Sequence, residues 1–205
     1  MGYRGLKEAV SKSNVKSCFA LTAGVDEGGR GALAGDVYAA AVILDKEKAI
    51  DGLKDSKQLS EKQRVNLYYE IKEEALCFSI GRANVLEIDS LNILQASLLA
   101  MSRAVKALSV QPEFVLVDGL HVPEWNYSAK AIVRGDSKVM AIAAASIVAK
   151  VTRDKEMALM GQLYPGYDFA KNKGYPTQAH LTGLKKVGPC IVHRRSFAPV
   201  SKLLE

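Results

Sequence analysis

The chain has 205 residues, 48% of them hydrophobic and 24% charged, a composition typical of a folded globular protein and unlike disordered, collagenous or coiled-coil sequences. At this length a domain buries roughly 70% of the surface of its unfolded chain, so one sizeable core forms without disulfide or metal support. We therefore expect one domain over residues 1–205. Its net charge of +6 favours polyanionic partners.

The positive charge is concentrated towards the C-terminus. Residues 169–204 contain no Asp or Glu. The basic residues of this stretch are Lys171, Lys173, Lys185, Lys186, Arg194, Arg195 and Lys202. Such a run forms either an ordinary solvated surface or a surface that binds phosphates.

The number and spacing of the cysteines and the length of the apolar runs bear on where in the cell the protein is located. Cys18, Cys77 and Cys190 are far apart and lack C-x-x-C spacing, so neither a disulfide framework nor a zinc site is indicated. The longest nearly continuous apolar run, residues 139–149, is shorter than the roughly 20 residues that cross a bilayer. We expect a cytoplasmic protein without membrane association.

The first half of the chain opens with two strand patterns separated by glycines. A capping box at Ser60 and Gln63 marks a helix start, because each side chain bonds the other residue's backbone amide. Apolar residues at spacings of three and four, from Leu91 to Leu108, form the stripe of another helix that ends before Pro112. In chain order, the predicted elements are strands over residues 20–25 and 37–44, a helix over 60–74, a strand over 76–83 and a helix over 91–108.

The second half alternates strands with helices. Strands are predicted over residues 114–118 and 129–133, followed by an Ala-rich helix over 138–160 whose small side chains permit close packing on a sheet. Thr177 caps a short helix that stops at Gly188, within a looser C-terminal segment. The order of elements predicts an α/β fold with a mixed central sheet flanked by helices and a small helical C-terminal segment.

Four acidic residues stand at the ends of these elements. Asp118 closes its strand, Asp26 and Glu27 follow an apolar run, and Asp136 precedes the Ala-rich helix. Each alone has a structural explanation, such as a turn or, for Asp136, a helix N-cap. Because side chains alternate along a strand, Asp26 and Glu27 can share a site only if the backbone breaks at Glu27.

A shared divalent cation, Mg²⁺ or Mn²⁺, gives these acids a common role, since both ions take hard oxygen ligands. Without a cation, each carboxylate pair at about 4 Å repels by roughly 4 kcal/mol at an effective dielectric of 20. Acidic ligands in a basic protein favour phosphodiester hydrolysis, in which metals activate water while Lys and Arg hold the backbone. The chain lacks a G-x-S-x-G elbow and a P-loop. The alternative is a non-catalytic nucleic-acid-binding module whose acids serve as caps.

Several motifs together resemble those of ribonuclease HII, from about residue 23 to residue 200. They are GVDEGGRGALAG at 24–35, DSKQLS at 55–60, VDG at 117–119, GDSK at 135–138, IAAASIVAKVTRD at 142–154, KGYPT at 173–177 and HRRSF at 193–197. The resemblance implies a ribonuclease H-like fold and an endonuclease that hydrolyses the RNA strand of RNA/DNA hybrids. It also implies cutting 5′ of single ribonucleotides embedded in duplex DNA, leaving a 3′-hydroxyl and a 5′-phosphate.

The same resemblance implies roles for individual residues. The metal-binding and catalytic acids are Asp26, Glu27, Asp118 and Asp136. The implied substrate contacts are the Gly29, Arg30 and Gly31 backbone on the ribose 2′-hydroxyl, the Tyr175 ring on the adjacent deoxynucleotide sugar, and Lys57, Ser146 and Lys150 on phosphates. Residues 165–205 become a basic substrate-binding segment. The expected partners are RNA/DNA hybrid and ribonucleotide-containing duplex DNA, bound by a monomer.

The chain departs from the family pattern at three positions near the acids. Gly28 replaces Ala, and Ala32 and Asp36 each replace Pro. Each exchange adds unfolded-chain freedom worth about 0.4 to 1 kcal/mol, which predicts a looser loop around the 2′-hydroxyl contact. A second alternative to the implied function is another metal-dependent nuclease of the same fold, one that requires runs of ribonucleotides.

Overall fold

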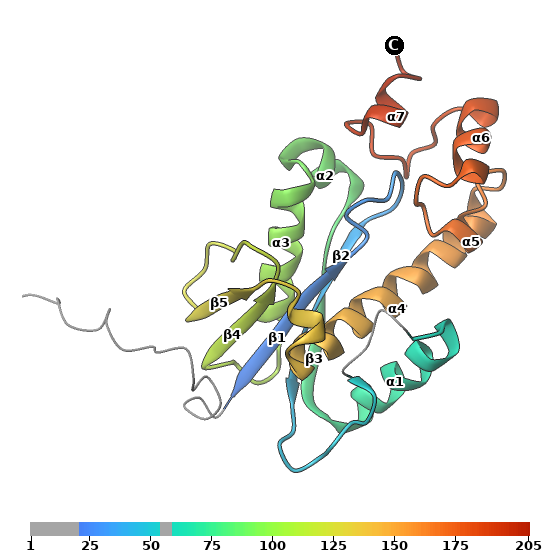
Figure 1. Ribbon diagram of the computed structural model, residues 1–205. Helices are drawn as coiled ribbons and strands as arrows, with labels where there is room; N and C mark the ends of the chain where they lie inside the picture. The colour runs from blue at the N-terminus through green and yellow to red at the C-terminus, as the bar shows by residue number, and fades with distance from the viewer. Residues whose placement is uncertain (1–20, 54–58) are drawn as a thin grey trace, which may run out of the picture.

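The structure is a computed structural model that describes residues 21–53 and 59–205 (Figure 1). Its elements are β1 (Thr22–Gly28), β2 (Val37–Leu44), α1 (Glu61–Glu74), β3 (Ala75–Ala83), α2 (Val85–Leu91), α3 (Ile93–Lys106), β4 (Phe114–Asp118), β5 (Ala129–Ile132), the 3₁₀ turn η2 (Gly135–Ser137), α4 (Met140–Leu163), α5 (Phe169–Asn172), α6 (Gln178–Val187) and α7 (Ala198–Ser201). No helix of the described ranges is long and apolar enough to cross a membrane.

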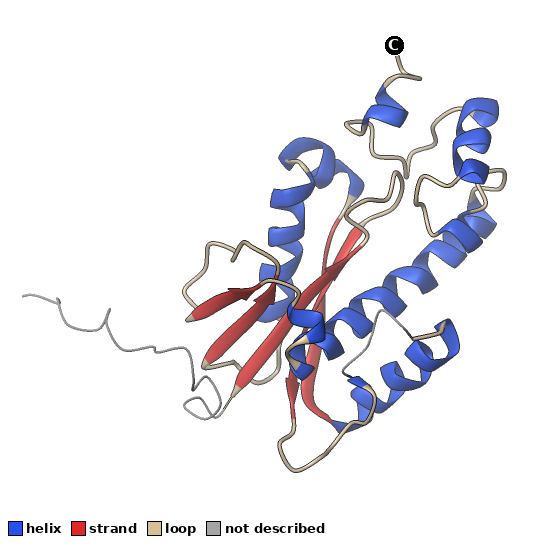
Figure 2. Cartoon of the chain, viewed as in Figure 1, coloured by secondary structure: helices blue, strands red, loops and turns tan. Residues whose placement is uncertain are grey.

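The strands form one five-stranded mixed sheet in the order β3-β2-β1-β4-β5. β2 runs antiparallel to both β1 and β3, whereas β4 runs parallel to both β1 and β5. Figure 2 shows helices on both sides of this sheet. The α/β fold with a mixed sheet flanked by helices is therefore confirmed.

Strand β2 is buried on both faces and explains how the layers form. Ala39 and Ala41 pack into a core with α3, whereas Ala40 and Val42 pack into a second core with α4 and α1. The strand reads as a continuous apolar run because both its faces are covered. Figure 1 shows α2 and α3 on one side of the sheet and α1 and α4 on the other.

The Ala-rich helix α4 lies close against the centre of the sheet. A Cβ atom at Gly24 of β1 would stand 2.1 Å from the carbonyl carbon of Ala141, so only glycine permits this approach. The helix is 24 residues long and extends past the sheet to α5 and α6 (Figure 1). It joins the strand ends to the C-terminal segment.

The helix predicted over residues 91–108 is confirmed as α3, which is two residues shorter at each end, whereas the short helix α2 before it was not predicted. Asn92 separates them with a φ of 71°, and its side-chain oxygen accepts hydrogen bonds from the amides of Leu94 and Gln95. Leu91 at the end of α2 keeps the same apolar spacing as the residues of α3, so the spacing alone does not reveal that the helix is interrupted at Asn92. A capping box at Asn84 and Glu87, present in the sequence, marks the start of α2.

The C-terminal segment has a small core of its own. Tyr167, Phe169 and Leu184 pack there with Leu33 and Ala34 from the loop between β1 and β2. The predicted short helix is confirmed as α6, whose N-cap Thr177 accepts a hydrogen bond from the amide of His180 at 3.3 Å and whose C-cap is Gly188. Segments far apart in sequence therefore meet beyond one end of the sheet.

Candidate active site

The register of β1 and β4 places Asp26 and Asp118 side by side. The last paired residues of these parallel strands are Val25 and Val117, and each aspartate follows directly. Because side chains alternate, both carboxylates lie on the face covered by α4, opposite Val25 and Val117. Asp26 is 6% exposed. The Ser146 hydroxyl of α4 donates a hydrogen bond to its carboxylate.

Glu27 joins this pair without a break in the strand, so the predicted break at Glu27 is wrong. β1 stays paired with β2 through Glu27 and Gly28, and the chain turns only at Gly29, whose φ is 98°. The Glu27 carboxylate interacts electrostatically with Asp118 and pairs with Arg30 Nη1 at 3.2 Å. Pairing with β4 has ended at this point of β1. The Glu27 amide therefore donates to Asp26 Oδ1 at 2.7 Å instead.

Burial and like charge act on these acids together. Burial raises the pKa of Asp26 well above its usual range, and repulsion by Glu27 and by Asp118 raises it further, against the hydrogen bond from Ser146. Burial also raises the pKa of Glu27, while Arg30 opposes the rise. Negative charge is thus crowded at the adjacent ends of two central strands.

Asp136 lies beside this group in the turn η2. The Gly135 amide donates to Asp118 Oδ1 at 2.6 Å, which fixes η2 against the end of β4. Asp136 is 3% exposed. The N-cap of α4 is Val139, so Asp136 is not the cap of the Ala-rich helix. The capping explanation for this acid is therefore wrong.

The chemistry of the acids fits a hard divalent cation. All four candidate metal ligands are carboxylates, and the repulsion of Asp26 by Glu27 and Asp118 is a charge pattern that a cation relieves. Within residues 21–53 and 59–205, no three His, Cys, Asp or Glu side chains are already arranged to hold a metal ion. Asp26 and Asp118 each direct one oxygen to a backbone amide. The carboxylates that could bind a cation are therefore present, and two of them accept hydrogen bonds from backbone amides.

A pocket of about 410 Å³ opens beside Glu27 and brings together most of the residues predicted from the sequence. Its lining residues are Glu27, Gly28, Gly29, Arg30, Gly31, Arg64, Ser146, Ile147, Lys150 and Tyr175. Arg64 of α1 was not predicted, although it follows the DSKQLS motif by four residues. Lys57, predicted to contact phosphate, lies outside the described residues.

The pocket residues differ in their other contacts. Lys150 Nζ pairs with Asp154 at 2.6 Å and stands 5.9 Å from the centre of the Tyr175 ring. Ser146 faces Asp26, so its hydroxyl is already bound to a carboxylate. Tyr175 approaches the loop at Gly31, where an added Cβ would lie 3.8 Å from its ring. The aromatic ring and the Gly29–Gly31 backbone therefore form two walls of one pocket.

Two buried arginines anchor the loop that carries Gly29, Arg30 and Gly31. Arg153 donates to the carbonyls of Asp36, Ala34 and Lys173 at 3.2, 3.0 and 2.8 Å. Arg194 donates to the carbonyls of Gly35 and Arg30, both at 2.9 Å. Although Arg194 belongs to the basic C-terminal run, it is fully buried and adds nothing to the surface. These bonds hold the loop without the two prolines of the family pattern.

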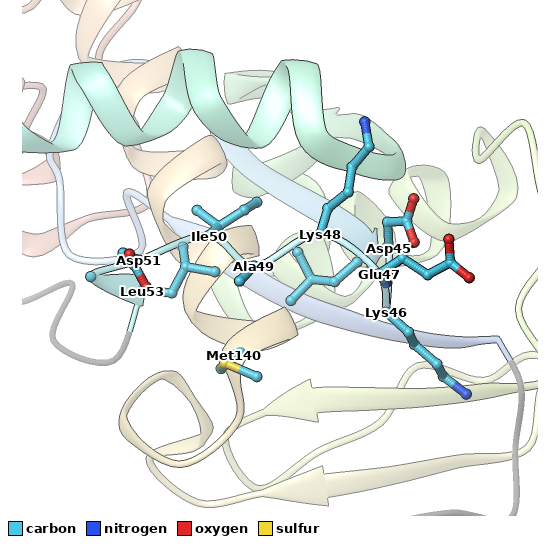
Figure 3. A pocket seen from close by; sticks show the side chains of 11 residues that line it. Asp45, Lys46, Glu47, Lys48, Ala49, Ile50, Asp51, Leu53 and Met140 are labelled. Carbon is cyan, nitrogen blue, oxygen red and sulfur yellow. Dashed lines mark hydrogen bonds between the residues drawn. The ribbon is translucent and has the colours of Figure 1, made fainter.

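A larger cavity, of about 720 Å³, is lined by none of the predicted site residues that the structure describes. It lies between residues 44–53 and Met140, where Figure 3 shows apolar side chains beside Asp45, Lys46, Glu47 and Lys48. Lys48 is paired with Glu74 of α1 at 2.9 Å. We therefore place the candidate site at the acids and the Gly29–Gly31 loop, and not at the larger cavity.

Solved structures identify the class of protein. The chain is similar to ribonuclease H2 from Pyrococcus horikoshii, with a TM-score of 0.73 and 27% identity over 89% of this chain and 96% of that one. It shares its fold with Bst ribonuclease HIII solved in complex with Mn²⁺, at a TM-score of 0.67 and 19% identity over 90% of this chain and 69% of that one. The mixed sheet and these similarities place the chain among the nucleases of the ribonuclease H-like fold.

Sequence comparison narrows this class to a family. The model of the family Ribonuclease HII matches residues 23–200. Ribonuclease HII of Nitrosococcus oceani is 59% identical over 183 residues, which cover 89% of this chain and 91% of the relative. The chain belongs to the ribonuclease HII family. It is an endoribonuclease that acts on RNA/DNA hybrids, as the sequence motifs predicted.

Proposed function

We propose that this enzyme cuts duplex DNA on the 5′ side of a single embedded ribonucleotide, with Asp26, Glu27, Asp118 and Asp136 holding divalent cations. The proposal rests above all on the placement of Asp26 and Asp118 at adjacent strand ends, next to a pocket walled by the Gly29–Gly31 backbone. Mg²⁺ or Mn²⁺ suits an all-carboxylate donor set. The Mn²⁺ complex of a ribonuclease HIII with the same fold supports this choice.

When bound, the cations supply Lewis-acid stabilisation of the charge that develops on the phosphate. The carboxylates hold them, and Ser146 orients Asp26 through its hydrogen bond. Water adds to phosphorus while the bond from phosphorus to the 3′-oxygen breaks, which leaves a 3′-hydroxyl and a 5′-phosphate. Lys150 and Arg64 face the pocket and place positive charge beside the phosphate backbone. Lys57 is proposed to contact a phosphate as well, on the basis of the family resemblance.

Recognition of the ribonucleotide falls to the two walls of the pocket. The Gly29, Arg30 and Gly31 backbone contacts the 2′-hydroxyl, the group that distinguishes RNA from DNA. A Cβ at Gly29 would stand 2.0 Å from Arg153 Nε, so no side chain fits at this position. The Gly29 backbone therefore carries no side chain of its own and packs directly against the Arg153 side chain. Tyr175 packs on the sugar of the next deoxynucleotide and so detects the RNA–DNA junction.

We further propose that residues 1–205 act as one catalytic domain whose segment 165–205 binds the duplex. Lys185 and Lys186 of α6 are exposed, and they belong to a stretch without acidic residues. Such lysines add affinity that is independent of sequence. The enzyme works as a cytoplasmic monomer in this proposal.

Cleavage of a DNA duplex containing one ribonucleotide tests the proposal. Activity in Mg²⁺ or Mn²⁺, its loss in chelator, and a mapped cut on the 5′ side of the ribonucleotide are expected. A continuous RNA/DNA hybrid serves as the matched substrate. Cleavage of the hybrid alone would identify a nuclease that needs ribonucleotide runs, and binding without cleavage under every metal condition would identify a binding module.

A further inference from the structure

A chain of hydrogen bonds runs through the buried C-terminal core to the backbone of Tyr175. His180 and His193 are 0% and 1% exposed, and their Nε2 atoms lie 3.1 Å apart. His180 Nδ1 stands 2.9 Å from the carbonyl oxygen of Tyr175. At the other end, the Cys190 amide donates to His193 Nδ1 at 3.0 Å. The function described so far uses neither histidine.

The partners at the two ends fix the tautomer of both rings. A carbonyl oxygen only accepts, so His180 must carry its proton on Nδ1 and accept on Nε2. His193 must then donate from Nε2 and accept on Nδ1, which matches the donating Cys190 amide. The Cys190 Sγ atom also lies 3.1 Å from His193 Nδ1, where it stands on the same accepting side as the amide. The hydrogen bonds from Cys190 to the Tyr175 carbonyl then all run in one direction. Both imidazoles are neutral in this arrangement.

The surroundings favour the neutral rings. Burial lowers the pKa of His180, and burial together with repulsion from His180 lowers the pKa of His193 to about 4. Tyr167 and Phe169 pack against the pair, with the Tyr167 ring centre 4.8 Å from that of His193. The pair therefore keeps one charge state near neutral pH.

The two histidines connect the two walls of the substrate pocket. His193 forms a β-bridge with Ala34, and the following amide of Arg194 donates to the Leu33 carbonyl at 2.8 Å. Those residues continue the loop of Gly29–Gly31. His180 holds the peptide carbonyl of Tyr175, whose ring is the opposite wall. A further bond, from the Leu33 amide to the Gly174 carbonyl at 2.8 Å, sets the spacing of the walls. The Tyr175 carbonyl also accepts a hydrogen bond from the amide of Thr177 at 2.8 Å, so this local bond and the bond to His180 together orient it.

We propose that the His180–His193 pair is a specificity-determining positioning element, which orients Tyr175 relative to the Gly29–Gly31 loop and so sets the preference for an RNA–DNA junction over a continuous hybrid. The inference rests on the proposed junction-reading role of Tyr175. Neither histidine touches the substrate. Both act through the orientation of the Tyr175 peptide.

The readout is the ratio of kcat/KM on a duplex containing one ribonucleotide to kcat/KM on a continuous hybrid, because a smaller folded fraction lowers both rates equally. His180→Phe and His193→Phe keep an aromatic ring and remove the hydrogen bonds, and each should lower the ratio about tenfold, since misplacement by about 1 Å can cost roughly 100-fold. His193→Gln restores an N–H donor and should recover most of the ratio. Leu184→Ala, also in the C-terminal core and 1% exposed, controls for a loosened core and should leave the ratio unchanged.

Tyr175→Ala in the same assay separates the two hypotheses. A lower ratio for Tyr175→Ala with unchanged ratios for both His→Phe variants, or with an equal fall for Leu184→Ala, would overturn the positioning role alone. An unchanged ratio for Tyr175→Ala would refute junction reading and the positioning role with it. Long-range ¹H–¹⁵N spectra give an independent measurement. They should show the Nδ1–H tautomer for His180 and the Nε2–H tautomer for His193, and a His180 ring protonated on Nε2 alone would contradict the proposal.

Discussion

The Asp118 carboxylate accepts a hydrogen bond from Gly135 and stands in the field of Asp26 and Glu27. Asp118→Asn keeps the shape and the acceptor oxygen but removes the charge. We expect kcat to fall by at least roughly 100-fold, because a metal-coordinating charge acts on the transition state more than on binding. Steady-state kinetics at saturating Mn²⁺ measure this loss.

The same variant should keep its thermal stability or gain some, since removal of the charge relieves repulsion on Asp26. Asp45→Asn, which removes an equal charge from the separate cavity of residues 44–53, is the matched control and should retain wild-type turnover. Turnover of Asp118→Asn within a few-fold of wild type would exclude this residue from the site.

Arg153 shows why a buried charge need not be catalytic. Its guanidinium donates to three backbone carbonyls from two separate segments, a geometry that the point charge of lysine does not reproduce. Arg153→Lys should lower the free energy of unfolding by about 3 kcal/mol, because buried acceptors lose their donors. Urea titration measures the change. Arg82→Lys, at a side chain 66% exposed, should cost less than about 0.5 kcal/mol, and equal losses would argue against the anchoring role.

At the scale of elements, the turn after β1 offers a matched pair of glycines. A Cβ at Gly28 would lie 3.6 Å from Ala149, an ordinary contact, whereas Gly29 has a φ of 98° and would clash with Arg153. Gly28→Ala should therefore stabilise the protein by about 0.4 to 1 kcal/mol, and Gly29→Ala should destabilise it by more than that. Chemical denaturation of both variants distinguishes them. Destabilisation by Gly28→Ala would show that this position needs glycine for another reason.

Helix α6 presents Lys185 and Lys186 to solvent. If both contact phosphate, replacing them with Ala should flatten the slope of log affinity against log salt by up to about two units on duplex DNA. Titrations across a salt series measure the slope. The double variant with Lys72→Ala and Lys106→Ala, exposed on α1 and α3, changes the charge equally and should leave the slope unaltered. Identical slopes for the two double variants would make the α6 lysines ordinary surface residues.

The elements that the sequence predicted well are those with local signals. The capping box at Ser60 and the apolar run of β4 depend on neighbouring residues, and both appear as expected. The break at Asn92 depends on a left-handed backbone that apolar spacing does not reveal. Arg194 belongs to the basic run that the sequence assigns to the surface, and only its tertiary contacts show that it is buried. Local patterns therefore located the acids, and long-range packing determined what supports them.

For the whole molecule, the buried His193 makes stability depend on pH. The unfolded chain binds a proton at a histidine near pH 6.5, whereas the native ring does so only near pH 4. Between these values the unfolded state holds more protons, so the free energy of unfolding falls as the pH is lowered. At about 1.4 kcal/mol per pKa unit, the loss amounts to at most about 3.5 kcal/mol.

His193→Gln removes this titration and isolates its contribution. The stability deficit of the variant relative to wild type should shrink as the pH falls from 7 to 4, because only the wild type loses stability through this ring. Urea titrations at several pH values provide the comparison. A deficit that stays constant across this range would mean that His193 titrates normally in the native state.

The contacts of Arg194 determine when the substrate pocket can form. Its guanidinium holds the carbonyl of Arg30, 164 residues earlier in the chain, and that of Gly35, 159 residues earlier. The last of the four acids along the chain is Asp136. A ribosome that adds about 5 to 20 residues per second therefore adds all four acids several seconds before Arg194, which anchors the glycine loop. A nascent chain at that stage contains its proposed metal ligands but cannot yet fix the loop proposed to recognise a ribose. The proposed selectivity for a ribose therefore forms later in synthesis than the acids do.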